Sequence, residues 1–193
     1  DPEKIVIKYG ADTARLFIMF ASPPTKELEW NDSAVEGSYR FIRKFYEASS
    51  KCDTTLNNID HNSLTKDEKL ARKKVYEALK KSDEVMNKTY AFNTLIASCM
   101  EALNALNNQT NKDIYTEGYY ILTNILEPII PHTCWEIANK LFKLENFQKP
   151  LAIKDEVFIE DSITLAITIN GKKRAEIEVA LNASKDEILV LAK

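Results

Sequence analysis

The fold of this chain is decided by Tyr9-Gly-Ala-Asp-Thr-Ala-Arg-Leu-Phe-Ile-Met-Phe-Ala-Ser-Pro-Pro24, which continues through Leu28-Glu-Trp30 to Val35-Glu-Gly-Ser-Tyr-Arg-Phe-Ile-Arg43. It predicts a helix over 12–21 that ends at the two prolines, because the residue before a proline avoids helical angles. Residues 16–20 are all apolar, so we expect this helix to be buried. Its single cation, Arg15, is expected to pair with a carboxylate. Trp30 lies in a short extended arm and is expected to anchor in the core.

The composition is that of a helical globular protein. The chain has 193 residues, of which 45% are hydrophobic and 28% charged, and it has four glycines. This length allows one large domain, or one domain with a small appendage. The net charge of −3 argues against a general nucleic-acid binder. It does not exclude nucleic acid, because phosphate binding needs a local basic patch and not a basic total.

The cysteines and the apolar segments exclude several classes of protein. Cys52, Cys99 and Cys134 are far apart and unpaired in the sequence, so neither a zinc site nor a disulfide framework is predicted. Free thiols are typical of a reducing cytoplasm. No apolar run approaches the length of a membrane-spanning helix, so no membrane partner is expected. The chain begins without methionine, and we expect it to be a piece of a longer protein.

The helix expected from Ser33 to about Ser49 carries the candidate site. Ser33-x-x-Glu36 has the spacing of a capping box. Three- and four-residue steps predict a buried face formed by Val35, Tyr39, Ile42, Phe45 and Tyr46.

Arg40, Arg43 and Lys44 fall on another face of that helix, at positions i, i+3 and i+4. A row of cations on one face favours contact with a phosphate backbone. The structural alternative is a solvated face on which Glu36 and Glu47 are the partners of these cations.

Four further helices are predicted: 65–88, opened by the capping box Thr65-x-x-Glu68, then 91–107, 112–127 and 131–144. The first carries eight Lys or Arg residues and is expected to be a solvated helix. Its predicted apolar stripe is Leu70, Tyr76, Leu79 and Met86. Pro128 interrupts the chain and Pro131 begins the last helix, at whose start His132 is expected to have a structural role.

A linker is expected at 145–157, and the pattern then changes to strict alternation. Two strands are predicted around Asn170-Gly171, followed by a short helix capped by Ser184-x-x-Glu187. A three-residue loop with Gly171 in a bulge would pair Leu165 with Ala175 and Ile163 with Ile177. Lys172, Lys173 and Arg174 follow the turn.

Four local segments resemble class I aminoacyl-tRNA synthetases. Tyr9–Phe20 is similar to the helix after their second catalytic signature, and Pro128-Ile-Ile-Pro131-His132 to a junction in the anticodon-binding domains of the subclass. The remaining segments resemble the bacterial leucyl-tRNA synthetase family in particular: Leu28-Glu-Trp30, Val35-Glu-Gly37, Arg40-Phe41 and Ile167-Thr-Ile-Asn-Gly-Lys-Lys-Arg174.

The resemblance implies a mainly α fold: an anticodon-binding-type helix bundle of class Ia synthetases followed by a small ββα element. It implies three parts: 1–30 as the tail of the catalytic and stem-contact region, 31–150 as the helical domain, and 151–193 as a linker with a truncated C-terminal hairpin and helix. The family's His-Ile-Gly-His and Lys-Met-Ser-Lys-Ser signatures are absent, and so is its inserted editing domain. We therefore expect no catalytic residue, metal or cofactor here, with ATP and Mg²⁺ bound by the parent enzyme and this part inactive alone.

The implied function is that of the tRNA-binding part of a leucine–tRNA ligase, an enzyme that uses ATP to attach leucine to tRNA-Leu. The expected partners are tRNA-Leu and the catalytic and editing domains of the same polypeptide, in a cytoplasmic and monomeric parent. The family's basic positions match Arg40 and Lys44, although relatives often carry Arg at the second, and Lys keeps the charge without the bidentate geometry. Arg43 shares that face, and Lys172 and Arg174 are additional candidates on the hairpin.

Two alternatives remain at this point. One is a helical protein-interaction module that shares only the bundle architecture, and it predicts a large exposed apolar patch without salt-dependent RNA binding. The other is the equivalent part of a valine, isoleucine or methionine synthetase, against which Leu28-Glu-Trp30 and Val35-Glu-Gly37 argue. Under the leucine-enzyme interpretation and under both alternatives, helix 12–21 is expected to expose apolar surface if its natural cover is absent.

Overall fold

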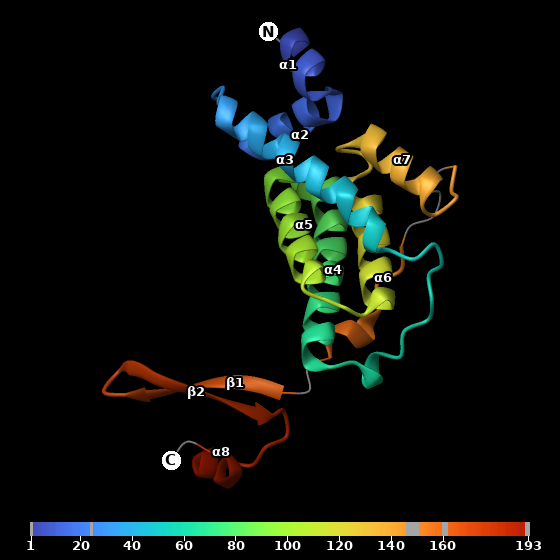
Figure 1. Cartoon of the computed structure of the whole chain (residues 1–193). Coiled ribbons are helices and arrows are strands. Elements are labelled where there is room, and N and C mark those ends of the chain that lie inside the picture. Colours follow the sequence, from blue (N-terminus) through green and yellow to red (C-terminus); the bar gives the residue numbers. More distant parts are fainter. Residues whose placement is uncertain (1, 24, 146–150, 160–161, 192–193) are drawn as a thin grey trace. The chain divides into compact units, whose positions relative to one another are not determined.

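A computed structural model describes residues 2–23, 25–145, 151–159 and 162–191. The chain divides into two compact units, 1–157 and 158–193. The first unit is helical and the second is a ββα element, as expected (Figure 1). Among the described residues, no helix combines the length and the apolar character that crossing a bilayer requires.

The helical unit is built on three helices that pack side by side (Figure 1). These are α4 (Lys66–Glu84), α5 (Phe92–Asn107) and α6 (Lys112–Leu126). The predicted core of α5 is confirmed, since Leu95, Ile96, Cys99, Leu103 and Leu106 are all at most 1% exposed. The bundle therefore owes its core to apolar periodicity that the sequence displays.

Both ends of α4 are set by local chemistry. At its start the predicted capping box is present, with the Thr65 hydroxyl bound by the Glu68 amide and the Glu68 carboxylate bound by the Thr65 amide. At its end the chain passes into a π-helical turn, Val85–Thr89, and reverses at Tyr90, which has a φ of 52°. Leu70, expected in the apolar stripe, is 54% exposed, so that part of the prediction is wrong.

Four more helices surround this core: α1 (Pro2–Tyr9), α2 (Ala11–Ala21), α3 (Asp32–Ala48) and α7 (Pro131–Lys140). Short 3₁₀ turns lie between α3 and α4, at Ser49–Lys51 and His61–Ser63. As predicted, Pro131 occupies the first turn of α7.

The helix α2 is only half buried, which corrects the expectation of complete burial. Leu16 and Phe17 are at most 1% exposed, whereas Ile18 is 56% exposed. Trp30 is 53% exposed, so it is not a core anchor; its ring packs edge-on against Phe17 and its indole N–H donates to Asp32. The described surface near α2 therefore contains an apolar region.

Arg15 does not pair with a carboxylate, which corrects the expectation from the sequence. It donates to the backbone carbonyls of Ile129 (3.0 Å) and Pro128 (2.8 Å), which follow the end of α6. Backbone carbonyls in a connection between two helices lie outside the helical hydrogen-bond pattern, and the Arg15 guanidinium satisfies two of them at once. Arg15 thereby holds α2 against the junction between α6 and α7.

The predicted linker is, over its described part, attached to the helical unit. Residues 151–157 belong to that unit, and a 3₁₀ turn covers Asp155–Phe158. Val157 is 2% exposed. Residues 146–150 lie outside the described residues.

The second unit contains β1 (Ser162–Ile169), β2 (Lys172–Ala180) and α8 (Lys185–Leu191). The predicted three-residue loop is wrong. Asn170 and Gly171, at φ 52° and 74°, form a two-residue turn between Ile169 and Lys172. The pairing register shifts by one residue between Ile167 and Thr168: Ile167 pairs with Ala175, whereas Thr168 pairs with Lys173.

The bulge produced by this shift contains Arg174. It restores apolar pairing in a register that differs from the predicted one, with Leu165 opposite Ile177 and Ile163 opposite Val179. The predicted Ser184–Glu187 capping box is present at the start of α8.

Candidate nucleic-acid interface

The helix α3 begins with a cap that the sequence did not identify. The side chain of Asn31 accepts a hydrogen bond from the Ala34 amide, so Asn31 is the N-cap and not Ser33. Val35, Ser38, Phe45 and Ala48 form the fully buried face. Tyr39 and Ile42 are half-buried, whereas Tyr46 is exposed and was wrongly assigned to the core.

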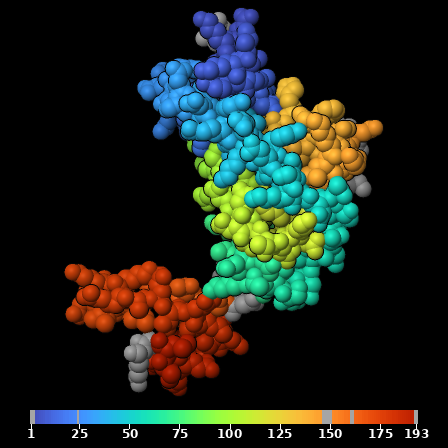
Figure 2. Space-filling view, in the orientation of Figure 1, coloured from blue at the N-terminus to red at the C-terminus, as the bar shows by residue number. Residues whose placement is uncertain are grey.

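The core holds α3 firmly against the bundle. Phe45 packs against the Tyr119 ring of α6 at 4.9 Å, and the Tyr119 hydroxyl donates to the Phe45 carbonyl. Figure 2 shows α3, coloured light blue to cyan, as a continuous band on the viewed face of the helical unit. The inner face of α3 is therefore fixed against the bundle, and its outer face is accessible to solvent.

Arg40, Arg43 and Lys44 all lie on the exposed side of α3. Arg43 pairs with Glu47 at 3.2 Å, in a contact whose two side chains are 63% and 66% exposed. Lys44 donates to the amide oxygen of Asn104 at 2.9 Å. Arg40 has no hydrogen-bond or ion-pair partner among the described residues.

None of the three cations is turned inward, and only one has a carboxylate partner. An exposed pair such as Arg43–Glu47 contributes at most about 1 kcal/mol, so an incoming phosphate can replace the carboxylate. The surface can therefore present three positive charges to an anionic strand.

The start of α7 lies beside α3 and is organised by one buried carboxylate of α2. Asp12 accepts hydrogen bonds from the Thr133 amide and hydroxyl, both at 2.7 Å, and from His132 Nδ1 at 2.9 Å. Burial by itself raises the pKa of Asp12, but the hydrogen bonds from Thr133 and His132 outweigh it and lower the pKa below its usual value. His132 thus has the structural position that the sequence predicted.

Replacing Asp12 by alanine is expected to lower the free energy of unfolding by about 2 kcal/mol, because the first turn of α7 loses the acceptor for its amide groups. Urea unfolding followed by circular dichroism measures this loss. Asp67→Ala is the matched control, since Asp67 is an exposed carboxylate in the first turn of α4. Equal stability of the two variants would contradict the role given to Asp12.

The hairpin cations are placed differently from those of α3. Lys172 is the first residue after the turn and Arg174 lies in the bulge; both are exposed and neither has a partner among the described residues. Lys173 is paired with Glu176. The hairpin and α3 belong to different units of the chain.

A buried polar cluster on α4 was missed by the sequence analysis. Arg72, assigned to a solvated charge run, is 1% exposed and forms a bidentate pair with Glu117 of α6 at 2.7 and 3.0 Å. It also donates to His61 Nδ1 and to Glu156, both at 3.1 Å.

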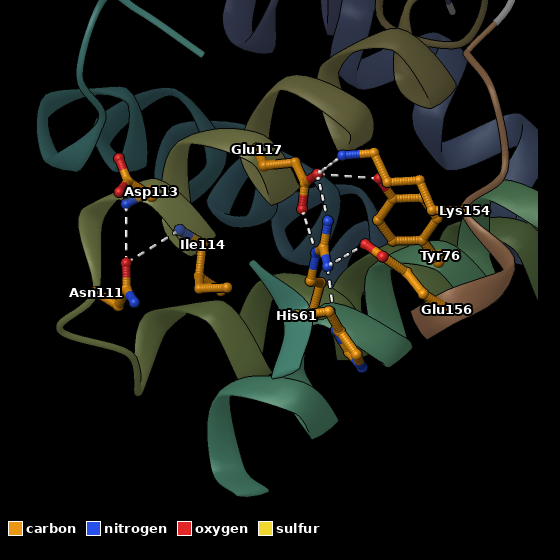
Figure 3. Close-up of polar contacts among 9 residues, drawn as sticks. His61, Tyr76, Asn111, Asp113, Ile114, Glu117, Lys154 and Glu156 are labelled. Atoms are coloured by element: carbon orange, nitrogen blue, oxygen red, sulfur yellow. Dashed lines mark hydrogen bonds and ion pairs between the residues drawn. The ribbon is translucent and has the colours of Figure 1, made fainter. Parts of the chain in front are cut away.

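Glu117 is the second centre of this cluster (Figure 3). It accepts further hydrogen bonds from Lys154 at 2.8 Å and from the Tyr76 hydroxyl at 3.0 Å. Burial raises the pKa of Glu117, but hydrogen bonds and ion pairs with Arg72 and Lys154 outweigh it and hold the pKa below its usual value. The cluster therefore ties α4, α6, the loop at His61 and the segment 151–157 together.

No cluster of three or more His, Cys, Asp or Glu side chains suited to a metal ion occurs among the described residues. Burial raises the pKa of Cys52 and of Cys99 to about 12, so both thiols are protonated at neutral pH.

Comparison with known proteins identifies the class to which this architecture belongs. Residues 68–189, more than half of the chain, match the family model described as the anticodon-binding domain of tRNA ligase. The chain belongs to that family.

Relatives that match over the whole of this chain are leucine–tRNA ligases. The chain is 66% identical over 197 residues to that of Aliarcobacter butzleri, 64% over 195 to that of a Nitratiruptor species and 60% over 197 to that of Helicobacter pylori strain HPAG1. Each match covers the whole of this chain and 24% of the relative, so the chain spans about a quarter of their length.

The resemblance to the leucine enzyme is confirmed by these matches, and neither alternative is favoured. The fold is similar to that of the crystallised ternary complex of Agrobacterium radiobacter K84 LeuRS, tRNA and LeuAMS. The TM-score is 0.79 at 20% sequence identity, over 98% of this chain and 26% of that one. The predicted bundle followed by a ββα element is likewise confirmed.

Proposed function

We propose that this chain is the tRNA-positioning part of a leucine–tRNA ligase, and that the exposed face of α3 contacts the sugar–phosphate backbone of tRNA-Leu. The observation that carries the proposal is that Arg40, Arg43 and Lys44 all point to solvent from a helix whose other face is buried. Phosphate contacts position a nucleic acid without reading its sequence. Lys172 and Arg174 of the hairpin add a second group of phosphate contacts.

In this proposal the chemistry belongs to the remainder of a longer polypeptide. That remainder binds ATP and Mg²⁺, activates leucine and edits errors, while this chain holds the tRNA and has no catalytic residue of its own. The high identity to leucine–tRNA ligases over the whole chain supports this division. We further propose that the parent enzyme is a cytoplasmic monomer.

The double substitution Arg40→Ala/Lys44→Ala is expected to weaken binding of tRNA-Leu about tenfold, which corresponds to about 1.4 kcal/mol. It is also expected to reduce the slope of log K against log salt by about one unit for each phosphate contact that is lost. Gel shifts at two salt concentrations, with tRNA-Leu and a second tRNA, measure both quantities.

The matched control is Lys88→Ala/Lys185→Ala, which removes the same charge from exposed positions elsewhere. If both double variants weaken binding equally, the effect is one of net charge and α3 has no special role. If neither changes the affinity, the assigned phosphate contacts are wrong.

A further inference from the structure

A groove between α3 and α7 adjoins the proposed phosphate-binding face. Its volume is about 400 Å³, within the range of small-ligand sites. Four residues of α3 and three of α7 line it: Ile42, Arg43, Tyr46, Glu47, His132, Thr133 and Glu136.

Two aromatic rings in this groove are held in place by hydrogen bonds. The Tyr46 hydroxyl donates to Glu136 at 2.8 Å, and His132 Nδ1 is held by Asp12 at 2.9 Å. Asp12 is ionised, so Nδ1 carries the proton and Nε2 remains without a described partner. Both rings are nevertheless accessible, since Tyr46 is 37% exposed and the His132 side chain 78%. Rings that are already oriented lose little conformational entropy when a ligand stacks on them.

The charges of the groove favour a base over a phosphate. Glu47 and Glu136 contribute two carboxylates, each of which is paired through one oxygen, with Arg43 and with Lys140 and Tyr46 respectively. Their second oxygens can accept hydrogen bonds from the N–H groups of a base edge, which a phosphate does not offer. Arg43 supplies a planar cation that can also stack on a base. Arg40, one turn earlier on α3 and without a described partner, is placed to meet the adjoining phosphate.

We propose that the groove between α3 and α7 takes one unstacked nucleobase of the bound RNA, stacked on Tyr46 with its amino-bearing edge toward a carboxylate. This inference rests on the proposed function, because it requires RNA on the face of α3. It adds a contact with a base to contacts that otherwise involve only the backbone. Unpaired bases are the usual targets of such aromatic surfaces in RNA-binding proteins.

Tyr46→Leu tests the proposal by removing the ring from an exposed position, where little stability depends on it. The affinity of the full chain for a labelled tRNA-Leu transcript is expected to fall about tenfold, from the loss of one stacked base. The slope of log K against log salt is expected to stay unchanged, because no phosphate contact is lost. Tyr46→Phe keeps the ring and is expected to bind nearly as the unmodified chain does.

Tyr90→Leu is the matched control, since Tyr90 is also exposed but lies in the turn after α4. Binding to a fully paired RNA duplex, which offers no unstacked base, should be equal for Tyr46→Leu and the unmodified chain. If Tyr46→Leu binds tRNA normally while Arg40→Ala weakens binding, the base site is wrong and the phosphate interface stands. If the unmodified chain does not bind tRNA, or if neither variant affects binding, both proposals fail. Equal losses for Tyr46→Leu and Tyr90→Leu would also overturn the base site.

Discussion

Replacing Arg72 by methionine is expected to lower the free energy of unfolding of the helical unit by about 4 kcal/mol. The substitution keeps the length of the side chain but leaves Glu117, whose side chain is 12% exposed, without its bidentate partner. Breaking a buried ion pair from one side costs about 3–5 kcal/mol, because a buried charge loses its main partner. Only Lys154 and the Tyr76 hydroxyl then remain beside Glu117. Urea unfolding at neutral pH measures the difference.

The pH dependence of this loss identifies its cause. The folded-state pKa of Glu117 is below its ordinary value of 4.5, so its ionisation stabilises the fold above that pH. This contribution is lost as the pH falls through the lowered folded-state pKa. In Arg72→Met, burial without the guanidinium favours the protonated carboxyl. The two proteins should therefore differ most at neutral pH and least in acid.

Lys74→Met is the matched control on the same helix. Lys74 forms a surface pair with Glu101 at 3.7 Å, and the two side chains are 41% and 68% exposed. Such pairs contribute between zero and about 1 kcal/mol, so this variant should be nearly as stable as the unmodified chain. A loss for Arg72→Met no larger than that for Lys74→Met would contradict the buried position of Arg72.

Gly118→Val is expected to destabilise the bundle by about 2 kcal/mol. A Cβ atom at position 118 of α6 would lie 2.7 Å from both terminal methyl groups of Leu106 and 3.1 Å from a methyl of Val75. Leu106 and Val75 are fully buried, so neither can move into free space. Overpacking of this kind costs about 1–3 kcal/mol, more than the roughly 1 kcal/mol gained by replacing a helical glycine. Thermal or urea unfolding measures the net loss.

Gly37→Ala provides the opposite expectation in another helix. No atom lies within 4 Å of a Cβ built at Gly37, so alanine should stabilise α3 by up to about 1 kcal/mol through helix propensity. A second check is Gly118→Ala combined with Leu106→Ala, in which the smaller side chain makes room for the new methyl group. If the losses in unfolding free energy of the two single variants simply add in the double variant, then Gly118 and Leu106 are not in close contact, which would contradict the packing of α5 against α6.

The sequence located most helices because their apolar periodicity and capping residues are local properties. The capping boxes at Thr65 and Ser184 and the helix start at Pro131 lie where they were predicted. The three cations of α3 were likewise found from spacing alone, and the structure leaves them exposed. Their contact with tRNA stays a prediction.

Arg72 was wrongly assigned to the solvated face of α4 because it lies in a run of charged residues. Its position in the helical repeat, which indicates burial, was given less weight. Arg72 precedes Val75, Tyr76 and Leu79 by three, four and seven residues, so it shares their face of α4. That spacing was a signal for burial, and the outward position of Leu70 follows from the same phase. Its partners Glu117 and Glu156 are 45 and 84 residues away, and no local pattern could have identified them.

The hairpin register shows a different limit. The alternation of apolar and polar residues correctly predicted that apolar residues pair across the two strands. A bulge can produce such pairing at more than one position in the hairpin. The turn determines the register of the hairpin. Asn170 and Gly171 both adopt positive φ and form a two-residue loop, so the unpaired residue of the bulge is Arg174. The choice therefore affects the position of a candidate phosphate-binding residue.

Family, helix order and the basic face of α3 could be read from the chain itself, because each depends on residues near one another in sequence. The partners of Arg15, Asp12 and Arg72, and the groove beside Tyr46, depend on helices that meet only after folding. Polar side chains pair with whatever the packed helices bring within reach, and that is set by the shape of the core and not by neighbouring residues.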